Sequence, residues 1–199
     1  MPTSRHRKAG YHHGDLRASV LRAAAELIEQ KGVDALSLRE VARRAGVSHN
    51  APYRHFPSRG ALLAALAVAG FERFRNELAD AERAGGLRAR GEAYIRFALA
   101  RPQHFRLMFG PGLDSAVGAN LHEQAARTFG GLQQAISAHA GKEAPYAAIA
   151  AWALVHGLSH LLLDQKLADS ARDAERLPEF VRAVLGAVRF SVAPAGRPE

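Results

Sequence analysis

Side chains suited to reading DNA are concentrated in residues 37–56, SLREVARRAGVSHNAPYRHF. His49 and Asn50 would lie in the first turn of a short helix, from which donors and acceptors reach base edges in the major groove. Ala51 beside them suits a thymine methyl group, and Arg39 suits either a base or a phosphate. Hydroxyl groups and cations suit phosphate oxygens, so Ser48, Tyr53, His55 and Arg59 are expected on the DNA backbone. The predicted DNA-contacting set comprises Arg39, Ser48, His49, Asn50, Ala51, Tyr53, Arg54, His55 and Arg59.

Two short helices joined by a tight turn are predicted to position these side chains. Ser37 followed by Glu40 fits the S-x-x-E capping box that starts a helix. Gly46 stands where the end of that helix needs a residue tolerant of positive φ. Ser48 then caps a second helix over residues 49–56. This layout is typical of a DNA-reading helix-turn-helix, and an ordinary helical hairpin is the alternative that shares its outline.

A further helix is expected ahead of this pair, because apolar residues recur at helical spacing between Asp15 and Gly32. Residues 1–13 before it form a basic arm. Pro52 is at odds with the second helix of the pair, because proline removes a backbone donor. The three helices would share an apolar core made of Leu16, Val20, Ala23, Ala24, Leu27, Ile28, Leu36, Leu38, Val41, Val47 and Phe56.

Charge is distributed unevenly along the chain. The first 60 residues carry eleven Lys and Arg against five Asp and Glu, a balance of +6 out of the chain's +8. A basic small domain attached to a nearly neutral larger one favours a polyanionic partner at one end of the molecule. The sequence has no cysteine, and no apolar run approaches a membrane span of about 20 residues. These features favour a cytoplasmic protein without a membrane partner.

The rest of the chain also follows helical periodicity and shows no strand-like alternation. Helices are expected over residues 59–84, then from a break at Gly85 and Gly86 to residue 100, and over 120–139, 146–168 and 178–192. The predicted fold class is therefore all-α. Its parts are a basic arm (1–13), a helix-turn-helix DNA-binding domain (14–60) and a helical ligand-binding and dimerisation domain (61–199).

The larger domain is rich in aromatic and soft apolar side chains, which suit the wall of a ligand pocket between helices. Aromatic residues at helical spacing also fill ordinary cores, so each residue is a candidate for either role. Tyr94 or His156 would supply the polar group that orients a ligand. The candidate lining comprises Phe71, Phe74, Tyr94, Phe97, Phe105, Met108, Phe109, Phe129, Trp152 and His156.

His156, His160 and Asp164 stand at i, i+4 and i+8 and share one helical face, an arrangement that suits zinc. A metal-responsive regulator is therefore an alternative, but histidines on an interface helix also pack as neutral polar residues. The sequence contains no phosphate-binding glycine loop, G-x-S-x-G turn or metalloprotease motif. Neither catalytic residues nor a cofactor is predicted, and a binding protein is favoured over an enzyme.

The segment LSLREVARRAGVSHNAPYRHFPSRGALL resembles the DNA-binding domain of the TetR family of bacterial transcriptional repressors. The match runs from about residue 11 to 66, with GVS at 46–48 and YRHF at 53–56 as its hallmarks. The C-terminal half resembles a subgroup with a Trp-His-Gly motif, through RPQHFRLMF at 101–109 and Trp152, His156 and Gly157. Pro52 stands where the family more often has leucine, and Arg59 replaces the usual lysine.

The resemblance implies a homodimer that binds a palindromic DNA operator and leaves it when a small molecule enters the C-terminal domain. We therefore expect a ligand-responsive repressor whose effector is hydrophobic or aromatic. A DNA-binding architectural protein that does not switch is the remaining alternative. The last two long helices would form the dimer interface through Leu154, Val155, Leu158, Leu161, Leu162, Phe180, Val184, Leu185 and Val188.

Overall fold

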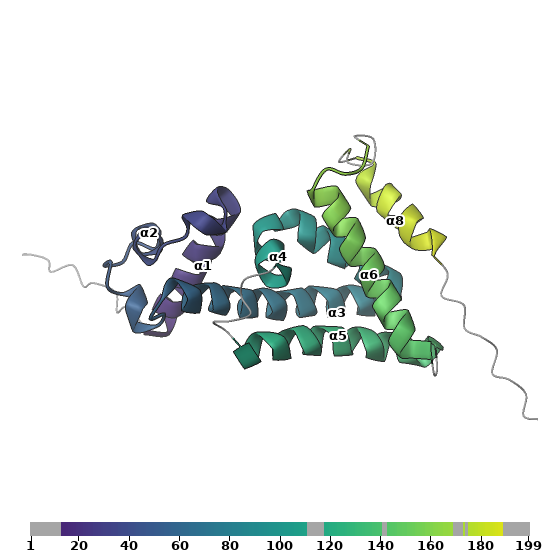
Figure 1. Cartoon of the computed structure of the whole chain (residues 1–199), viewed down its shortest axis with the longest axis horizontal. Coiled ribbons are helices and arrows are strands. Elements are labelled where there is room, and N and C mark those ends of the chain that lie inside the picture. Colours follow the sequence, from purple (N-terminus) through teal and green to yellow (C-terminus); the bar gives the residue numbers. More distant parts are fainter. Residues whose placement is uncertain (1–12, 111–117, 141–142, 169–172, 174, 189–199) are drawn as a thin grey trace, which may run out of the picture.

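The computed structural model describes residues 13–110, 118–140, 143–168, 173 and 175–188, and all regular structure within them is helical (Figure 1). The predicted all-α class is therefore confirmed. Helix α3 runs along the molecule from the N-terminal unit to the C-terminal bundle, with α5 beside it. The elements are α1 (His13–Lys31), η1 (Val33–Ala35), α2 (Leu38–Arg44), η2 (Pro52–Arg54), α3 (Arg59–Ala100), α4 (Pro102–Phe109), α5 (Gly118–Ala140), α6 (Ala144–Leu163) and α8 (Leu177–Ala187).

The N-terminal unit is held together by the apolar face of α1. Val20 and Leu27 on that face are fully buried, and they belong to one cluster with Val41 of α2 and Phe56. Each such side chain stabilises the fold by about 1.5–3 kcal/mol when it is removed from water. The three-segment core predicted from spacing is therefore confirmed, and Phe56 anchors the segment between α2 and α3 to it.

The cap and the turn of α2 follow the prediction. Ser37 Oγ accepts a hydrogen bond from the Glu40 N–H at 3.2 Å, and Gly46 has φ of +68°. The Glu40 carboxylate binds Arg43, with Oε1 2.7 Å from Nη2 and Oε2 2.9 Å from Nε. This hydrogen-bonded pair lowers the pKa of Glu40 to about 2. The Glu40 carboxylate therefore pairs with Arg43, whereas in a full capping box it would accept a hydrogen bond from the backbone N–H of Ser37.

The predicted second helix over residues 49–56 is wrong. This segment forms consecutive turns and the short 3-10 helix η2. Pro52 has no N–H and cannot bond to the Ser48 carbonyl, which instead accepts from the Ala51 N–H at 2.9 Å. The Phe56 side chain is only 2% exposed and fixes the end of the segment in the core. The residue that conflicted with a helix therefore determines the local structure.

Helix α3 is bent where two adjacent glycines were predicted to break it. Gly86 has φ of +69° and ψ of −162°, a conformation that other residues rarely adopt. The helix begins with Ser58 as its cap, since Ser58 Oγ accepts from the Ala61 N–H at 3.1 Å. The bend creates a second helix start at Leu87, inside the C-terminal bundle.

Helix α6 ends at Leu163, earlier than the predicted residue 168, and Gln165 just after it has φ of 55°. Its mean hydropathy of 1.5 and its 20 residues would let it cross a membrane, which corrects the expectation that no apolar run reaches that length. One such helix is weak evidence for a membrane span, because the core helices of soluble proteins share this composition. Helix α8 ends at Ala187, and residues 189–192 of the predicted last helix lie outside the described residues.

Candidate DNA interface and ligand cavity

Most of the predicted DNA-contacting side chains are exposed. Tyr53 is 46% exposed, whereas Ala51 and His55 are half-buried beside it. Helix α2 packs against η2, so the side chains come from adjacent elements. Their contacts with DNA stay a prediction, and their exposure is what such contacts require. The other exposed members are Arg39, Ser48, His49, Asn50, Arg54 and Arg59.

Arg59 has an intramolecular partner set that its sequence position did not reveal. Its Nε donates to the Leu36 carbonyl at 2.9 Å, and its Nη2 donates to the Val33 carbonyl at 2.7 Å. These bonds tie the start of α3 to the η1 turn after α1. The planar guanidinium reaches both oxygens at once, which a lysine ammonium on a flexible stem does less well. Arg59 therefore has a structural role whether or not it also touches DNA.

We expect Arg59→Ala to lower the free energy of unfolding by about 1–3 kcal/mol, because it removes two hydrogen bonds from a charged donor. Urea unfolding followed by circular dichroism measures the change. Arg54→Ala is the matched control, since Arg54 is an exposed arginine of the same segment, and its stability should stay close to the parent value. Equal stability of the Arg59 and Arg54 variants would contradict the bracing role.

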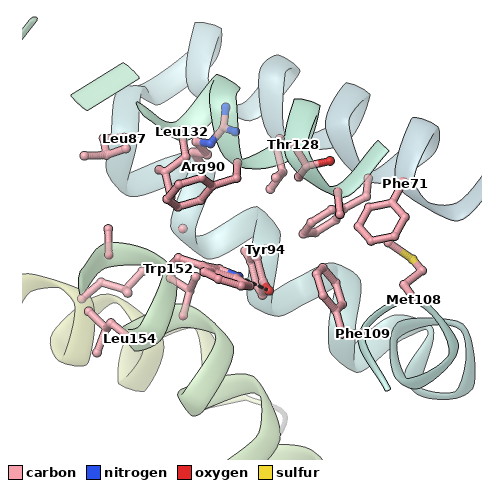
Figure 2. Close-up of a pocket in the computed structure, with 18 of the residues that line it drawn as sticks. Phe71, Leu87, Arg90, Tyr94, Met108, Phe109, Thr128, Leu132, Trp152 and Leu154 are labelled. Atoms are coloured by element: carbon pink, nitrogen blue, oxygen red, sulfur yellow. Dashed lines mark hydrogen bonds between the residues drawn. The ribbon is translucent and has the colours of Figure 1, made fainter. Parts of the chain in front are cut away.

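A cavity of about 580 Å³ lies in the C-terminal bundle between α3, α4, α5, α6 and α8 (Figure 2). This volume is within the range of about 300–1,000 Å³ that small-molecule sites occupy. Aromatic and apolar side chains make up most of its wall, as the aromatic density of the domain predicted. The predicted residues that line it are Phe71, Phe74, Tyr94, Met108, Phe109, Phe129 and Trp152.

Three residues of the predicted lining do not reach the cavity wall. Phe97 is 1% exposed and borders a smaller hollow between α1, α3 and α4 instead. Phe105 is fully buried, with its ring centroid 4.8 Å from that of Phe109. His156 is not part of the wall, but it lies directly behind it, with Nδ1 2.8 Å from the Tyr94 hydroxyl and its ring centroid 5.2 Å from that of Phe109. Residue type could not distinguish aromatic residues of the cavity wall from those of the core, because phenylalanine occurs at both kinds of position.

Two arginines at the wall were missed by the sequence reasoning. Arg88 and Arg90 follow the bend in α3 directly, and both line the cavity. Arg90 is 8% exposed, and its Nη1 donates to Glu82 Oε2 at 2.6 Å. Arginine is rarely buried unless it is paired, so the residue type of Arg90 did not suggest a place in the cavity wall. The signal available in the sequence was the glycine pair, Gly85 and Gly86. It marks the start of a new helical segment, whose first turn carries both arginines.

A hydrogen-bonded chain joins the cavity wall to the Trp-His-Gly motif. Trp152 Nε1 donates to the Tyr94 hydroxyl oxygen at 3.2 Å, and that hydroxyl lies 2.8 Å from His156 Nδ1. Indole only donates, so the Tyr94 oxygen accepts from Trp152, and the Tyr94 hydroxyl can donate its own proton to an unprotonated Nδ1. Burial raises the pKa of Tyr94, and burial together with the nearby His160 lowers the pKa of His156. Both shifts favour the neutral side chains of Tyr94 and His156 in the folded protein.

A second histidine, His104, is buried where α4 packs against α3. His104 is 9% exposed, and its Nε2 donates to the Leu66 carbonyl at 2.9 Å. Burial lowers the pKa of His104, although the carbonyl partner acts in the opposite direction. His104 and His156 thus both favour the neutral form in the folded protein.

Stability is expected to fall as the pH drops from 7.5 to 5.5. In that range the unfolded chain takes up protons at His104 and His156 while the folded state resists them, so protons favour unfolding. Each kcal/mol lost lowers Tm by about 2–4 °C in a chain of this size. Thermal unfolding of His104→Gln, which keeps an amide donor for Leu66, should show a smaller fall than the parent. The exposed His49→Gln variant should follow the parent, and a parent Tm independent of pH would contradict this explanation.

The histidines proposed as metal ligands are engaged elsewhere. His156 bonds to Tyr94, and the Asp164 carboxylate pairs with Arg106. His160 Nδ1 lies 3.9 Å from Asp164 Oδ2. Among the described residues, no group of three His, Asp or Glu side chains is arranged to hold a metal ion. The alternative of a metal-responsive regulator therefore has no support from this geometry.

Comparison with known proteins places both halves of the chain in one family. Residues 20–66 match the model of bacterial regulatory proteins of the tetR family, and residues 87–187 match the tetracyclin repressor-like C-terminal domain. The tetracycline repressor protein class A from transposon 1721 of Escherichia coli is 49% identical over 51 residues, 26% of this chain and 24% of that protein. The uncharacterized HTH-type transcriptional regulator YobS of Bacillus subtilis is 31% identical over 90 residues, 43% of this chain and 47% of that protein.

These two alignments span less than half of either relative's length. A solved structure of a protein of unknown function from Rhodococcus sp. RHA1 extends the similarity over the whole fold. It is 34% identical, with a TM-score of 0.75 over 90% of this chain and 96% of that one. Because the C-terminal model covers half of the chain and the N-terminal model covers the helix-turn-helix unit, the protein belongs to the TetR family of bacterial transcriptional regulators.

Proposed function

We propose that the protein is a repressor that binds a palindromic operator as a homodimer and is released by a small molecule in the bundle cavity. The observation that carries this proposal is the cavity itself, about 580 Å³ with a largely apolar wall. An architectural DNA-binding protein that never switches has no use for such a space. We assign the protein no catalytic activity, and a regulator that reads DNA acts in the cytoplasm.

The dimer is supported by the surface of α6. Only 28% of the apolar 18-residue window of this helix is buried within one protomer. Ile149 is 53% exposed and Leu161 43% exposed, and the exposed Ala153 and Gly157 lie between them. A stripe of apolar and small residues on one helix face suits close contact with the same helix of a second copy. The symmetry of such a pair would match a palindromic operator.

The interface residues proposed here differ from those predicted by the sequence. Val155, Leu158 and Leu162 are between 5% and 9% exposed and belong to the protomer's own core. They lie on the inner face of α6, whereas Leu161 lies on the outer face. Val188, just after α8, is 41% exposed and also lines the cavity, and its place at the dimer interface stays a prediction. Hydrophobic content alone could not separate the two faces of a helix that is apolar all round.

The switch is supported by the position of α4 between the two domains. The backbone N–H groups of Gln103 and His104, in the first turn of α4, donate to the Glu29 carboxylate of α1 at 3.2 and 2.8 Å. At the other end of α4, Met108 and Phe109 line the cavity. A ligand that displaces these two residues would therefore move α1, and with it the DNA-contacting segment. We keep the domain division at about residue 60, with α3 shared between the two domains.

The proposal is tested by selecting operator fragments from random DNA with the purified full-length protein. We expect the selected sequences to be palindromic, and binding to weaken as salt rises, because phosphate contacts release counterions. Small molecules are then screened for release of the labelled operator in a fluorescence anisotropy assay. Selection of a single half-site, or operator binding that no cavity ligand alters, would contradict the proposed repressor.

A further inference from the structure

Some polar side chains of the cavity wall are hydrogen-bonded within the protein, whereas others have N–H groups without a partner among the described residues. Tyr94 and Trp152, near its middle, are bonded to each other and to His156. The Thr128 hydroxyl donates to the Gln124 carbonyl at 2.8 Å. Each of these groups therefore already makes a hydrogen bond inside the protein. A ligand that enters the cavity gains most where the wall holds donors with hydrogens to spare.

Such donors are found at the arginine end. Arg90 donates to Glu82 through Nη1. Its Nε and Nη2 have no hydrogen-bond partner in the part of the chain that the structure describes. Arg88 has no such partner among the described residues either, and its guanidinium lies against Gly186 of α8. A guanidinium carries five N–H donors and no acceptor, so both side chains can bind only acceptor groups.

The charge of the wall is one-sided. Arg88 and Arg90 both line the cavity, whereas no Asp or Glu lies among its lining residues in the described chain. Glu82 contacts Arg90 without reaching the wall. Both arginines stand in the first turn after the bend at Gly86, and the start of a helix favours a negative group. The charged side chains of the wall would therefore repel a cationic ligand.

The other end of the cavity is apolar. Figure 2 shows Arg90 beside Leu87 and Leu132 at one side of the cavity, and Phe71 with Met108 at the opposite side. Phe71 and Phe109 meet edge to face with ring centroids 5.2 Å apart. This end offers aromatic faces and a thioether but no charge.

We propose that the effector is an amphipathic anion, with a carboxylate, sulfonate or phosphate group at Arg88 and Arg90 and an apolar body against Phe71, Phe109 and Met108. This inference rests on the proposed ligand cavity and adds the chemical class of the ligand. Arg90 binds the anion through its spare Nε and Nη2 groups while Glu82 holds its Nη1. Arg88, whose guanidinium lies against Gly186, contacts the anion from the α8 side of the cavity.

The test uses two probes with the same aromatic frame. 1-Anilinonaphthalene-8-sulfonate carries an anionic group, and N-phenyl-1-naphthylamine is the same molecule without it. Both absorb where tryptophan emits, and the chain's one tryptophan, Trp152, lines the cavity. Quenching of Trp152 emission in the full-length dimer therefore gives the Kd of each probe. We expect both to bind, with the sulfonate the tighter of the two.

We expect Arg90→Gln to raise the Kd of the sulfonate probe about tenfold, because one charge-assisted contact is lost. The Kd of the neutral probe should stay unchanged. Arg88→Gln, at an exposed position that does not endanger folding, should weaken the sulfonate probe alone as well. Arg83→Gln is the matched control, since Arg83 is an exposed arginine of the same helix that pairs with Asp80 outside the cavity, and it should change neither Kd.

The outcomes separate the two proposals. If both probes bind but the arginine variants leave the sulfonate Kd unchanged, or weaken the two probes equally, the anionic class is wrong and the cavity proposal stands. If neither probe quenches Trp152 in the parent protein, the ligand cavity itself is wrong and the anionic class falls with it.

Discussion

The double variant Gly157→Glu, Leu161→Glu is expected to be a monomer that binds the operator about 10²- to 10⁴-fold more weakly than the parent. The two positions lie one turn apart on the exposed face of α6, so a symmetric dimer would bury four unpaired carboxylates. A second half-site bound by the same molecule acts at a high effective concentration, and a monomer loses that gain. Sedimentation velocity measures the mass, and anisotropy of a labelled selected operator measures the affinity.

The protomer itself should tolerate both changes. A Cβ placed on Gly157 meets no atom within 4 Å, and Leu161 is 43% exposed, so neither glutamate displaces a neighbour inside the chain. Gln134→Glu adds a carboxylate to an exposed position of α5 and should leave both mass and affinity unchanged. A double variant that stays dimeric would show that the interface lies on another face.

Local signals in the sequence predicted much of the scaffold. The cap at Ser37, the positive φ at Gly46 and the bend at Gly86 all occur where residue type predicted them, whereas the helix that Ser48 was predicted to cap does not form. Each confirmed feature depends on one residue and the backbone next to it. The α1 core was predictable for the same reason, because a single amphipathic face has only one way to bury itself.

The site depends on contacts between distant segments, which spacing does not contain. Arg59 was assigned to phosphate, and it binds carbonyls more than twenty residues away. Arg90 was not considered, because its burial results from a bend and from Glu82. Phe105 and Phe109 have the same residue type, and only the packing of α4 puts one in the core and the other at the cavity. Prediction failed where tertiary geometry, and not residue type, makes the difference.

The tie between Glu29 and α4 is the contact on which the proposed switch depends most. Arg101 at the N-cap position offers no side-chain cap, so the carboxylate of another helix takes that role. The opposite side of α4 presses on α3, since a Cβ on Gly70 would lie 2.7 Å from Met108 Sδ and 2.8 Å from His104 Nε2. Helix α4 is therefore held at its first turn by Glu29 and packed closely against α3 near Met108, so we expect displacement of Met108 to be passed on to Glu29.

Glu29→Ala is expected to leave operator affinity close to that of the parent and to remove most of the effect of ligand on it. Coupling between two sites of one protein is commonly worth a factor of about 5–150 in affinity, and this variant should bring that factor close to one. The measurement is the Kd of the labelled operator with and without saturating 1-anilinonaphthalene-8-sulfonate, for parent and variant. Linkage requires that the operator weaken the probe by the same factor, so titration of the probe against the protein–operator complex gives an independent value.

Glu26→Ala is the control that separates coupling from damage to the DNA-binding unit. Glu26 is also an acid of α1, but it pairs with Arg44 of α2, 2.9 Å away, inside the N-terminal unit. Any effect of its loss should fall on operator affinity, and the coupling factor should stay as in the parent. Equal loss of coupling in both variants would mean that general loosening of α1 disconnects the domains. Retention of full coupling in Glu29→Ala would mean that the signal passes through α3 alone, whose continuous segment from Arg59 to the bend is the other connection between cavity and DNA-contacting segment.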